Sequence, residues 1–204
     1  MPELQRLRPD HAPALLAFER ENRAYFAASV PDRGDAFFDE FEDRHRALLD
    51  EQETGTIHFH VLVGEGGEVL GRFNLVDAVD GGAELGYRVA ERATGRGVAT
   101  AGVREVCRLA WQEYGLTRLT AVTTLDNEGS RAVLGRVGFG AVGSVTLDGK
   151  PGASYELDLG VSYGADPGAS SGSDPGVSFG SDPDPGVSSG SDPGASSGSG
   201  REVP

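Results

Sequence analysis

Residues 92–100 of the sequence read RATGRGVAT, a loop between the strand-like segment GYRV and a long run with apolar residues at helical spacing. The first turn of such a helix carries backbone N–H groups without intrahelical partners and the positive end of the helix dipole. Gly95 and Gly97 would let an anion approach those amides, and Arg92 and Arg96 would add charged, bidentate donors. The stretch therefore predicts a cradle for phosphate or pyrophosphate.

This loop has three alternative interpretations. A loop with exposed arginines and no ligand is the simplest, because glycine pairs are common in loops. A P-loop is excluded, since it needs Gly-Lys-Ser/Thr and the residues after the second glycine are VAT. A dinucleotide-binding Rossmann turn lacks its third glycine, where Thr100 stands, and polar residues separate the strand from Gly95. Asp126 could imitate the acid that binds ribose, so the Rossmann turn stays as a minor alternative.

The apolar patterns along the rest of the chain predict one mixed α/β domain. Asp10 is placed as the N-cap of the first helix, and Gly115 and Gly138 as helix stops. One mostly antiparallel sheet would include a parallel crossover through the central helix. We expect strands at residues 3–9, 57–63, 68–76, 83–89, 116–125, 141–147 and 153–159. We expect helices at 11–22, 35–49 and 97–115, and a short helix within 126–139 that stops at Gly138.

The strand AELGYRV at residues 83–89 has two distinct faces. Side chains alternate along a strand, so Leu85, Tyr87 and Val89 face one way. The residues between them, which include Glu84, face the other way. This face places a carboxylate next to a small glycine at position 86.

The composition limits the partners and the location of the protein. The formal net charge of the 204 residues is -14, and an acidic chain is a poor binder of nucleic acid or of anionic membranes. It suits an amine-bearing partner, although many acidic proteins are simply soluble. The single cysteine and the polar N-terminal sequence, without a signal-peptide pattern, favour a cytoplasmic protein.

Residues 161–204 differ in kind from the rest of the chain. They consist of imperfect D-P-G-[AV]-S repeats with almost no apolar residues, which predicts a disordered tail that solvates the protein or recruits a partner. The six acidic residues of the tail stand against one arginine, so -9 of the net charge of -14 belongs to residues 1–160. We therefore expect a folded domain at residues 1–160 and a disordered tail at residues 161–204.

Three motifs in order resemble the GCN5-related N-acetyltransferase (GNAT) superfamily. R-A-T-G-R-G-V-A matches the family's Q/R-x-x-G-x-G/A pattern, GYRV resembles its fourth strand, and LTRLTAVTTLDNEGSRAVLGRVGF is similar to its fifth strand and N-x-x-[AS]…GF segment. The resemblance covers nearly all of residues 4–159. N-x-x-S without a tyrosine resembles the branch that includes ribosomal-protein N-terminal acetyltransferases. The resemblance to the GNAT superfamily implies the acyl-CoA N-acyltransferase fold, in which helices flank a single mixed sheet.

The resemblance implies that the cradle binds the pyrophosphate of acetyl-CoA, used as co-substrate without a metal. The pantetheine arm would lie between the strand that ends at Val89 and the strand around residues 120–124, and an N–H near Val89 would polarise the thioester carbonyl. Asn127 would cap the helix after it and touch the cofactor, with capping alone as the alternative. The residues so implied in cofactor binding are Tyr87, Val89, Arg92, Gly95, Arg96, Gly97, Val98, Ala99, Thr100 and Asn127.

In the implied reaction an amine attacks the thioester directly, so a group must remove a proton from the amine. Glu84 is the candidate base, directly or through a water, with an ordinary exposed strand glutamate as the alternative. Many family members protonate the leaving thiolate with a tyrosine, but Leu134 stands at that position here. Ser130, Tyr87 or water would then take this role.

Other reactive or aromatic residues have more ordinary interpretations. His58 and His60 share a strand face, but no third metal ligand stands out, so we expect packing. Cys107 lies on the apolar stripe of the central helix and is expected in the core. Phe37, Phe38 and Phe41 are chiefly core residues. The resemblance also suggests that Tyr25, Phe26 or Phe38 lines the acceptor pocket.

The sequence therefore predicts an acetyltransferase that acts on a primary amine, either a protein N-terminus or a small molecule. The alternative is a CoA-binding module without catalysis, which the missing tyrosine at position 134 supports. The acceptor pocket carries no motif, and no interface between copies can be recognised in these residues.

Overall fold

The computed structural model describes residues 2–164, so most of the predicted tail lies outside the described residues. The strands are β1 (Glu3–Arg6), β2 (His58–Val63), β3 (Val69–Val79), β4 (Gly82–Val89), β5 (Arg118–Thr124), β6 (Gly140–Leu147) and β7 (Lys150–Asp158). The helices are α1 (Ala12–Glu21), α2 (Arg23–Ala27), α3 (Asp35–Asp39), α4 (Phe41–Glu53), α5 (Val98–Gln112), α6 (Glu128–Val137) and α7 (Leu159–Tyr163), with 3-10 turns at Pro9–His11 and Glu91–Ala93. The first residues of the predicted tail thus belong to α7.

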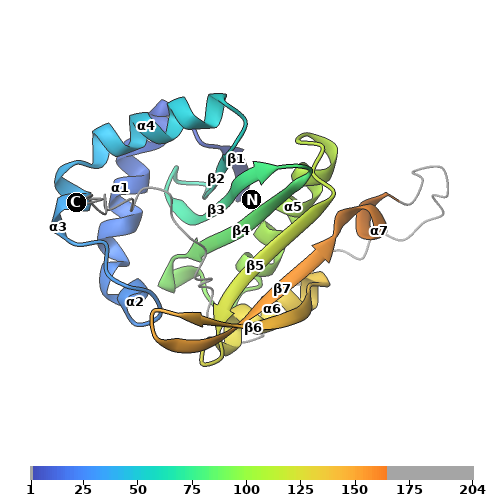
Figure 1. The fold of residues 1–204 in the computed structure, drawn as a ribbon. Coiled ribbons are helices and arrows are strands. Elements are labelled where there is room, and N and C mark those ends of the chain that lie inside the picture. The colour runs from blue at the N-terminus through green and yellow to red at the C-terminus, as the bar shows by residue number, and fades with distance from the viewer. Residues whose placement is uncertain (1, 165–204) are drawn as a thin grey trace, which may run out of the picture.

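Within residues 2–164 one sheet joins all of these strands in the order β1-β2-β3-β4-β5-β7-β6 (Figure 1). β4 and β5 run parallel and are connected through α5, whereas every other neighbouring pair is antiparallel. The predicted single mixed sheet flanked by helices is confirmed. The parallel crossover places the start of α5 at the end of β4.

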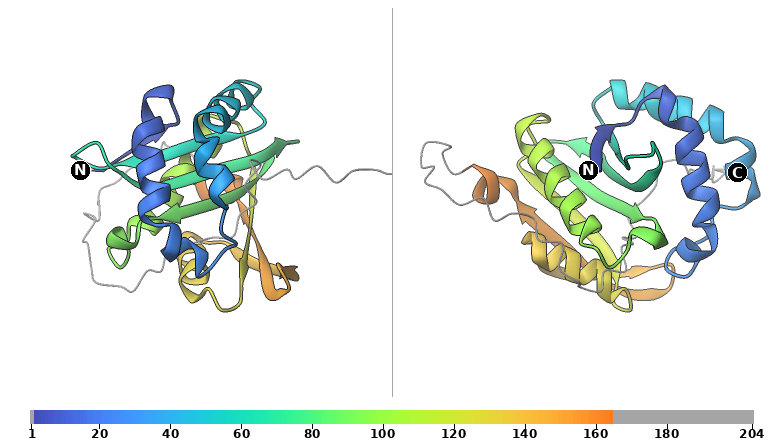
Figure 2. Two further views of the ribbon diagram at one scale, coloured as in Figure 1. Left: turned by 90° about the vertical axis from the view of Figure 1, so that its left-hand side faces the viewer. Right: turned by 180° about the vertical axis from the view of Figure 1, so that it is seen from behind.

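The helices cover the two faces of the sheet unequally. The N-terminal helices α1–α4 lie over one face, and α5 and α6 lie over the other (Figure 2). α5 packs on β3 and β4, while α1 packs on β3 from the opposite side. The central strands β3 and β4 are therefore buried on both faces, which explains their nearly continuous buried patterns.

The contact between α5 and the sheet depends on one glycine. A Cβ atom at Gly102 would overlap the ring of Phe73, which is fully buried on β3. The Phe73 ring in turn stacks on Tyr87 of β4, with ring centroids 6.1 Å apart. This close approach fixes the position of α5, and hence of the loop before it, relative to β4.

Two local expectations differ from the structure. Asp10 does not cap α1: it lies in a 3-10 turn, and its carboxylate accepts a 3.1 Å hydrogen bond from Arg8 Nε. The predicted helix at 35–49 is divided into α3 and α4 at Glu40, whose φ of -98° and ψ of 12° leave the helical region. Across the break the ring of Phe37 meets that of Phe41 edge to face, at 5.8 Å between centroids.

The histidines and the cysteine pack in the interior, as expected. The ring of His58 stacks on Tyr114 at 3.7 Å between centroids, and His60 Nε2 lies 2.8 Å from the Tyr114 hydroxyl. Cys107 is fully buried on α5, and burial raises the pKa of its thiol to about 12, which removes its reactivity as a nucleophile. Among residues 2–164 no three His, Cys, Asp or Glu side chains gather where they could hold a metal ion. None of the helices in this part of the chain combines the length and apolar character needed to cross a bilayer.

Candidate functional site

The centre of the sheet separates where β4 and β5 diverge. In the described structure the two strands pair only at Gly82↔Arg118, Ala83↔Leu119 and Glu84↔Thr120. β4 continues to Val89 without further pairing to β5, while β5 stays paired with β7 along its whole length. A wedge-shaped gap therefore opens in the sheet beyond Glu84, and it widens toward the start of α5.

Two hydroxyl groups lie beside this gap on the face of α5 and α6. The Tyr87 hydroxyl on β4 lies 3.1 Å from Ser130 Oγ in the first turn of α6, and both residues are buried. Asn127 caps α6 by accepting a 3.0 Å hydrogen bond from the Ser130 amide, so the predicted capping role is confirmed. The contact spans from β4 to the helix that follows β5, so it links the two sides of the opening.

Thr123 on β5 adds a buried polar atom that the sequence analysis did not single out. It is fully buried on the same strand face as Leu119 and Ala121. Among the described residues its hydroxyl has no hydrogen-bond partner. A buried hydroxyl without a partner costs free energy, so it marks a place where a polar ligand atom would be accepted.

The loop before α5 has the backbone geometry of an anion site. Gly97 is the N-cap of α5 with a left-handed φ of 72°, and Gly95 has a φ of 70°. The first intrahelical hydrogen bond runs from the Ala101 amide to the Gly97 carbonyl at 2.9 Å. The amides of Val98, Ala99 and Thr100 therefore precede the intrahelical ladder and are available to a ligand.

Arg92 and Arg96 provide the positive charge at this loop. Both side chains are exposed, and within residues 2–164 neither forms an ion pair. The space beside Gly97 is open, since a Cβ atom at this position would meet no atom within 4 Å. The residues present thus fit a phosphate group in charge, in donors and in space.

Glu84 stands at the apex of the gap. It is half-buried and is the last β4 residue that pairs with β5. Thr120 lies opposite Glu84 on one side and opposite Glu156 of β7 on the other, so the two glutamates share a row on one sheet face. That face is covered by the N-terminal helices, and α5 covers the other (Figure 2).

On this second face a charged cluster lies between α1 and the sheet. Glu19 of α1 is only 2% exposed, and its oxygens lie 3.3 Å from Arg72 Nη1, 3.4 Å from Arg88 Nη1 and 3.5 Å from Arg33 Nε. We name Glu19, Arg33, Arg72 and Arg88 the arginine cluster. Three guanidinium groups here share one carboxylate.

A hollow lies where the linker after α2 approaches the turn between β6 and β7. It has a volume of about 170 Å³ and is lined by residues 27–31, Thr124, Leu147, Asp148 and Lys150. Its place beside the end of β5 puts it at the open side of the gap. In Figure 1 α2 lies next to the β6–β7 turn at the lower left.

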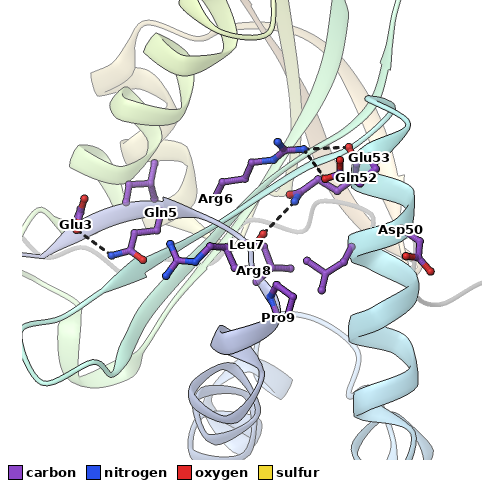
Figure 3. A pocket seen from close by; sticks show the side chains of 11 residues that line it. Glu3, Gln5, Arg6, Leu7, Arg8, Pro9, Asp50, Gln52 and Glu53 are labelled. Carbon is purple, nitrogen blue, oxygen red and sulfur yellow. Dashed lines mark hydrogen bonds and ion pairs between the residues drawn. The ribbon is translucent and has the colours of Figure 1, made fainter.

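A larger hollow lies away from the gap, at the β1 edge of the sheet. It has a volume of about 770 Å³ and lies between residues 3–9 and the end of α4 (Figure 3). Its walls are held by hydrogen bonds, including 3.1 Å from Gln52 Nε2 to the Leu7 carbonyl and 3.3 Å from Arg6 Nη2 to the Gln52 carbonyl. None of the sequence-predicted site residues lines it.

The divided sheet and the glycine loop agree with the comparison to known families. A family model described as an acetyltransferase (GNAT) domain matches residues 3–140. The chain belongs to this GNAT family.

Curated relatives of this GNAT chain come from Bacillus. It is 37% identical over 75 residues to the putative ribosomal N-acetyltransferase YdaF of Bacillus subtilis, a match that covers 36% of this chain and 41% of the relative. It is 27% identical over 131 residues to the probable N-acetyltransferase YjcK of the same organism, covering 61% and 72% respectively. The match to YdaF thus spans less than half of that relative's length.

Solved structures show the same GNAT fold at low sequence identity. A ribosomal-protein-S5-alanine acetyltransferase from Vibrio fischeri superposes with a TM-score of 0.73 at 18% identity, covering 78% of this chain and 93% of that one. A spermidine N-acetyltransferase from Vibrio cholerae in complex with CoA and spermine gives 0.66 at 14% identity, covering 78% and 95%. Enzymes with such different acceptors share the fold, so the fold alone leaves the acceptor open.

The structure brings together some of the predicted site residues of the GNAT chain. Tyr87 and Ser130 meet directly, and Asn127 holds the turn that presents Ser130. Glu84 and Val89 mark the two ends of the β4 segment along the gap. The remaining residues lie in the loop and first turn that lead from β4 into α5: Arg92, Gly95, Arg96, Gly97, Val98, Ala99 and Thr100.

Proposed function

We propose that this chain transfers an acetyl group from acetyl-CoA to a primary amine by direct attack. The observation that carries the proposal is the gap that opens beyond Glu84, with the glycine loop at its wide end. A linear molecule with an anionic end fits such a gap, because the β4 backbone past Glu84 offers hydrogen-bonding groups to it.

The cofactor would be held along this path. Acetyl-CoA supplies an activated thioester when it is bound. The amides of the first turn of α5, with Arg92 and Arg96, would hold its pyrophosphate. The Thr123 hydroxyl and the backbone from Tyr87 to Val89 would hydrogen-bond the arm in the gap, and a Val89 N–H would polarise the thioester carbonyl.

Glu84 would accept the proton of the attacking amine, directly or through one water. It lies at the apex of the gap, on the sheet face of the N-terminal helices, and the acceptor would approach from this side. A carboxylate fixed there can take the proton from the amine as its nitrogen attacks the thioester carbon. The proton of the leaving group would come from the hydroxyl pair of Tyr87 and Ser130, since Leu134 occupies the tyrosine position and is fully buried.

The acceptor would be a protein N-terminus or a small amine. Relatives and structural neighbours are named for ribosomal proteins and for spermidine, which are both amine acceptors. The buried thiol of Cys107, the chain's single cysteine, suits a reducing compartment, and we propose a cytoplasmic location.

The test mixes the purified full chain with acetyl-CoA and a panel of amines that includes peptide N-termini, and follows free thiol release. We expect release that depends on the acceptor. Absence of acceptor-dependent release across the panel would contradict the proposal.

Arg96→Ala tests the cradle separately. Losing one charge-assisted contact should weaken CoA binding about tenfold in calorimetry. Arg104→Ala is the matched control, since Arg104 is exposed later on α5 and bonds the Arg136 carbonyl. Equal CoA affinity of the Arg96 variant and the wild type would overturn the cradle assignment.

The second candidate function is a CoA-binding module without catalysis. It is favoured by Leu134, which leaves the site without the tyrosine acid common in the family. It predicts CoA binding in calorimetry together with no thiol release, so the same two assays separate the two functions.

A further inference from the structure

Asn22 is a buried amide at the junction between α1 and α2. The residue is only 6% exposed, and it lies between Glu21, the last residue of α1, and Arg23, the first residue of α2. Burying an amide costs free energy unless its oxygen and its nitrogen both find hydrogen-bond partners. The partners of Asn22 therefore show which parts of the fold depend on this residue.

Both ends of the Asn22 side chain are hydrogen-bonded. Nδ2 donates to the Phe18 carbonyl of α1 at 2.8 Å, and Oδ1 accepts the backbone N–H of Glu91 at 2.9 Å. Only one orientation of the amide satisfies both partners, because one partner is an acceptor and the other is a donor. The side chain thus connects α1 to the segment that follows β4, which lies beside the α1–α2 junction in Figures 1 and 2.

The backbone of Asn22 is fixed as well. Its N–H donates to the Phe18 carbonyl at 3.2 Å, and its carbonyl accepts the Phe26 N–H at 2.8 Å. Phe18 and Phe26 are both buried, and their ring centroids lie 5.3 Å apart. A side chain held in this way presents its oxygen from a rigid base, so it can fix the position of a mobile partner.

Glu91 is the first residue of the 3-10 turn that leads into the glycine loop. The residue before it is held by the sheet, since the Ala90 N–H donates to the Leu70 carbonyl at 2.8 Å. In the part of the chain that the structure describes, the other hydrogen bonds of residues 91–97 stay within residues 90–101. The bond from Asn22 therefore ties this loop to the N-terminal helices.

The loop gains from such a tie because two glycines follow the turn. Gly95 and Gly97 have left-handed φ angles of 70° and 72°. Glycine has wide conformational freedom, and fixing a backbone costs free energy. A loop whose first residue is already held in place loses less freedom when it binds a ligand, so it binds more tightly.

We propose that Asn22 is a positioning residue, which holds the start of the glycine loop in the arrangement that binds the pyrophosphate of acetyl-CoA. This inference rests on the proposed function of the same loop. Asn22 acts through the backbone of Glu91, which fixes where Arg92 and Arg96 begin. Its loss should raise the KM for acetyl-CoA and leave kcat nearly unchanged, because Glu84 lies at the other end of the gap.

The test measures CoA binding to the full chain by calorimetry, with and without Asn22→Ala. We expect the Kd for CoA to rise about fivefold, the size of one hydrogen bond. With an acceptor identified by the amine panel, the KM for acetyl-CoA should rise by about the same factor while kcat stays within about twofold. Asn22→Leu, which keeps the volume but has no acceptor atom, is the second variant if the first fails to fold. A Kd equal to that of the wild type would overturn the inference.

Gln52 provides the matched control, because it is a second buried amide with the same kind of partners. Its Oε1 accepts the Phe59 N–H at 3.0 Å, and its Nε2 donates to the Leu7 carbonyl at 3.1 Å. It connects α4 to β1 and β2, away from the gap. Gln52→Ala should lower the midpoint of urea unfolding much as Asn22→Ala does, but keep the Kd for CoA within about twofold of the wild type. An equal rise in Kd in both variants would mean that Asn22 acts only through overall stability, and would overturn the inference.

Hydrogen exchange of the ligand-free chain separates this inference from the proposed function. If the wild type binds no CoA, the proposed function fails, but the hold of Asn22 on the loop is still measured by NMR. The amides of Glu91, Ala93 and Thr94, which are hydrogen-bonded in the structure, should exchange about fivefold faster in Asn22→Ala and at the wild-type rate in Gln52→Ala.

Asn22→Asp distinguishes the two bonds of the amide. Its carboxylate still accepts the Glu91 N–H but cannot donate to the Phe18 carbonyl. We expect exchange of the loop amides in this variant to stay within about twofold of the wild type. Equal exchange rates in the wild type and Asn22→Ala, or equally fast exchange in Asn22→Asp and Asn22→Ala, would overturn the inference.

Discussion

Glu84 has a backbone fixed by strand pairing and lies next to the unpaired part of β4. It is still held in the regular register with Thr120, so its backbone is fixed, and it adjoins the residues of β4 that β5 no longer accompanies. A base gains from such a position because its carboxylate is oriented by a rigid strand while the next space is open to substrate.

We predict that Glu84→Gln lowers kcat by roughly a hundredfold to ten-thousandfold, because the amide cannot accept the amine proton. CoA affinity should stay unchanged in calorimetry, since the cradle lies at the other end of the gap. Thiol release slowed to this extent, together with unchanged CoA binding, would show that Glu84 acts in the transfer step and not in cofactor binding.

Glu156→Gln provides the matched control for this residue. Glu156 lies in the same row of the sheet, half-buried, but one strand farther from the gap. We expect it to keep kcat within about threefold of the wild type, below the usual contribution of an acid or base. An equal loss in both variants would show that Glu84 has no special role.

At the residue scale the sequence predicted the residues with a motif and missed those without one. The glycine loop, Asn127 as a cap and the face of Glu84 follow from local spacing. Glu19 could be suspected only as a charge at a helical spacing of four from buried Leu15. Its partners Arg33, Arg72 and Arg88 come from a linker and two strands, and long-range packing of this kind has no local signal.

Glycines in the left-handed conformation flank α5 at both ends. Gly97 begins the helix with φ 72°, and Gly115 follows its end with φ 65°. A Cβ at either position would meet no atom within 4 Å, so the backbone conformation is the shared constraint. The two glycines differ only in that the first lies at the proposed anion site.

We predict that Gly97→Ala and Gly115→Ala each destabilise the fold by about 1 kcal/mol, the cost of a left-handed alanine. Urea unfolding would measure this. Only Gly97→Ala should also weaken CoA binding, about tenfold, because its methyl group stands over the first amides of α5. Equal CoA affinity in the two variants would contradict an anion site at this turn.

Helices and strands could be told apart in the sequence because the spacing of apolar residues was clear. The wrong predictions concerned the ends of helices and the junctions between them. The break between α3 and α4 falls at Glu40, with no glycine or proline in the sequence to indicate it. Asp10 has the right residue type for a cap, but Arg8 two residues before binds its carboxylate instead. The divergence of β4 from β5 was expected from the family resemblance and has no signal in either strand alone.

The whole molecule should respond to pH through its buried histidines. Burial lowers the pKa of His60 to about 4, and also lowers the pKa values of His58, His45 and His11. Between about pH 6.5 and pH 4 the unfolded chain therefore binds more protons than the folded chain. Stability is fully present above pH 6.5 and is lost as the pH falls through this window, by roughly 3 kcal/mol for His60 alone.

We predict that urea unfolding at pH 7.5 and pH 5 shows a lower free energy of unfolding at pH 5. His60→Gln should reduce this difference, because glutamine does not titrate and retains a polar group for the Tyr114 hydroxyl. A difference of the same size in the variant would mean that other groups, such as carboxylates, produce the whole pH dependence.

The short contact between β4 and β5 also has a mechanical consequence. The sheet consists of two parts, one with strands β1, β2, β3 and β4 and one with strands β5, β7 and β6. The two parts are joined by only three residue pairs between β4 and β5, and α5 connects these two strands. A molecule that hydrogen-bonds to both β4 and β5 would link the two parts of the sheet. Its binding free energy then adds to the resistance of the fold against unfolding, by about 2.7 kcal/mol at a hundred times its dissociation constant. The proposed co-substrate would thereby be a structural part of the sheet for as long as it stays bound.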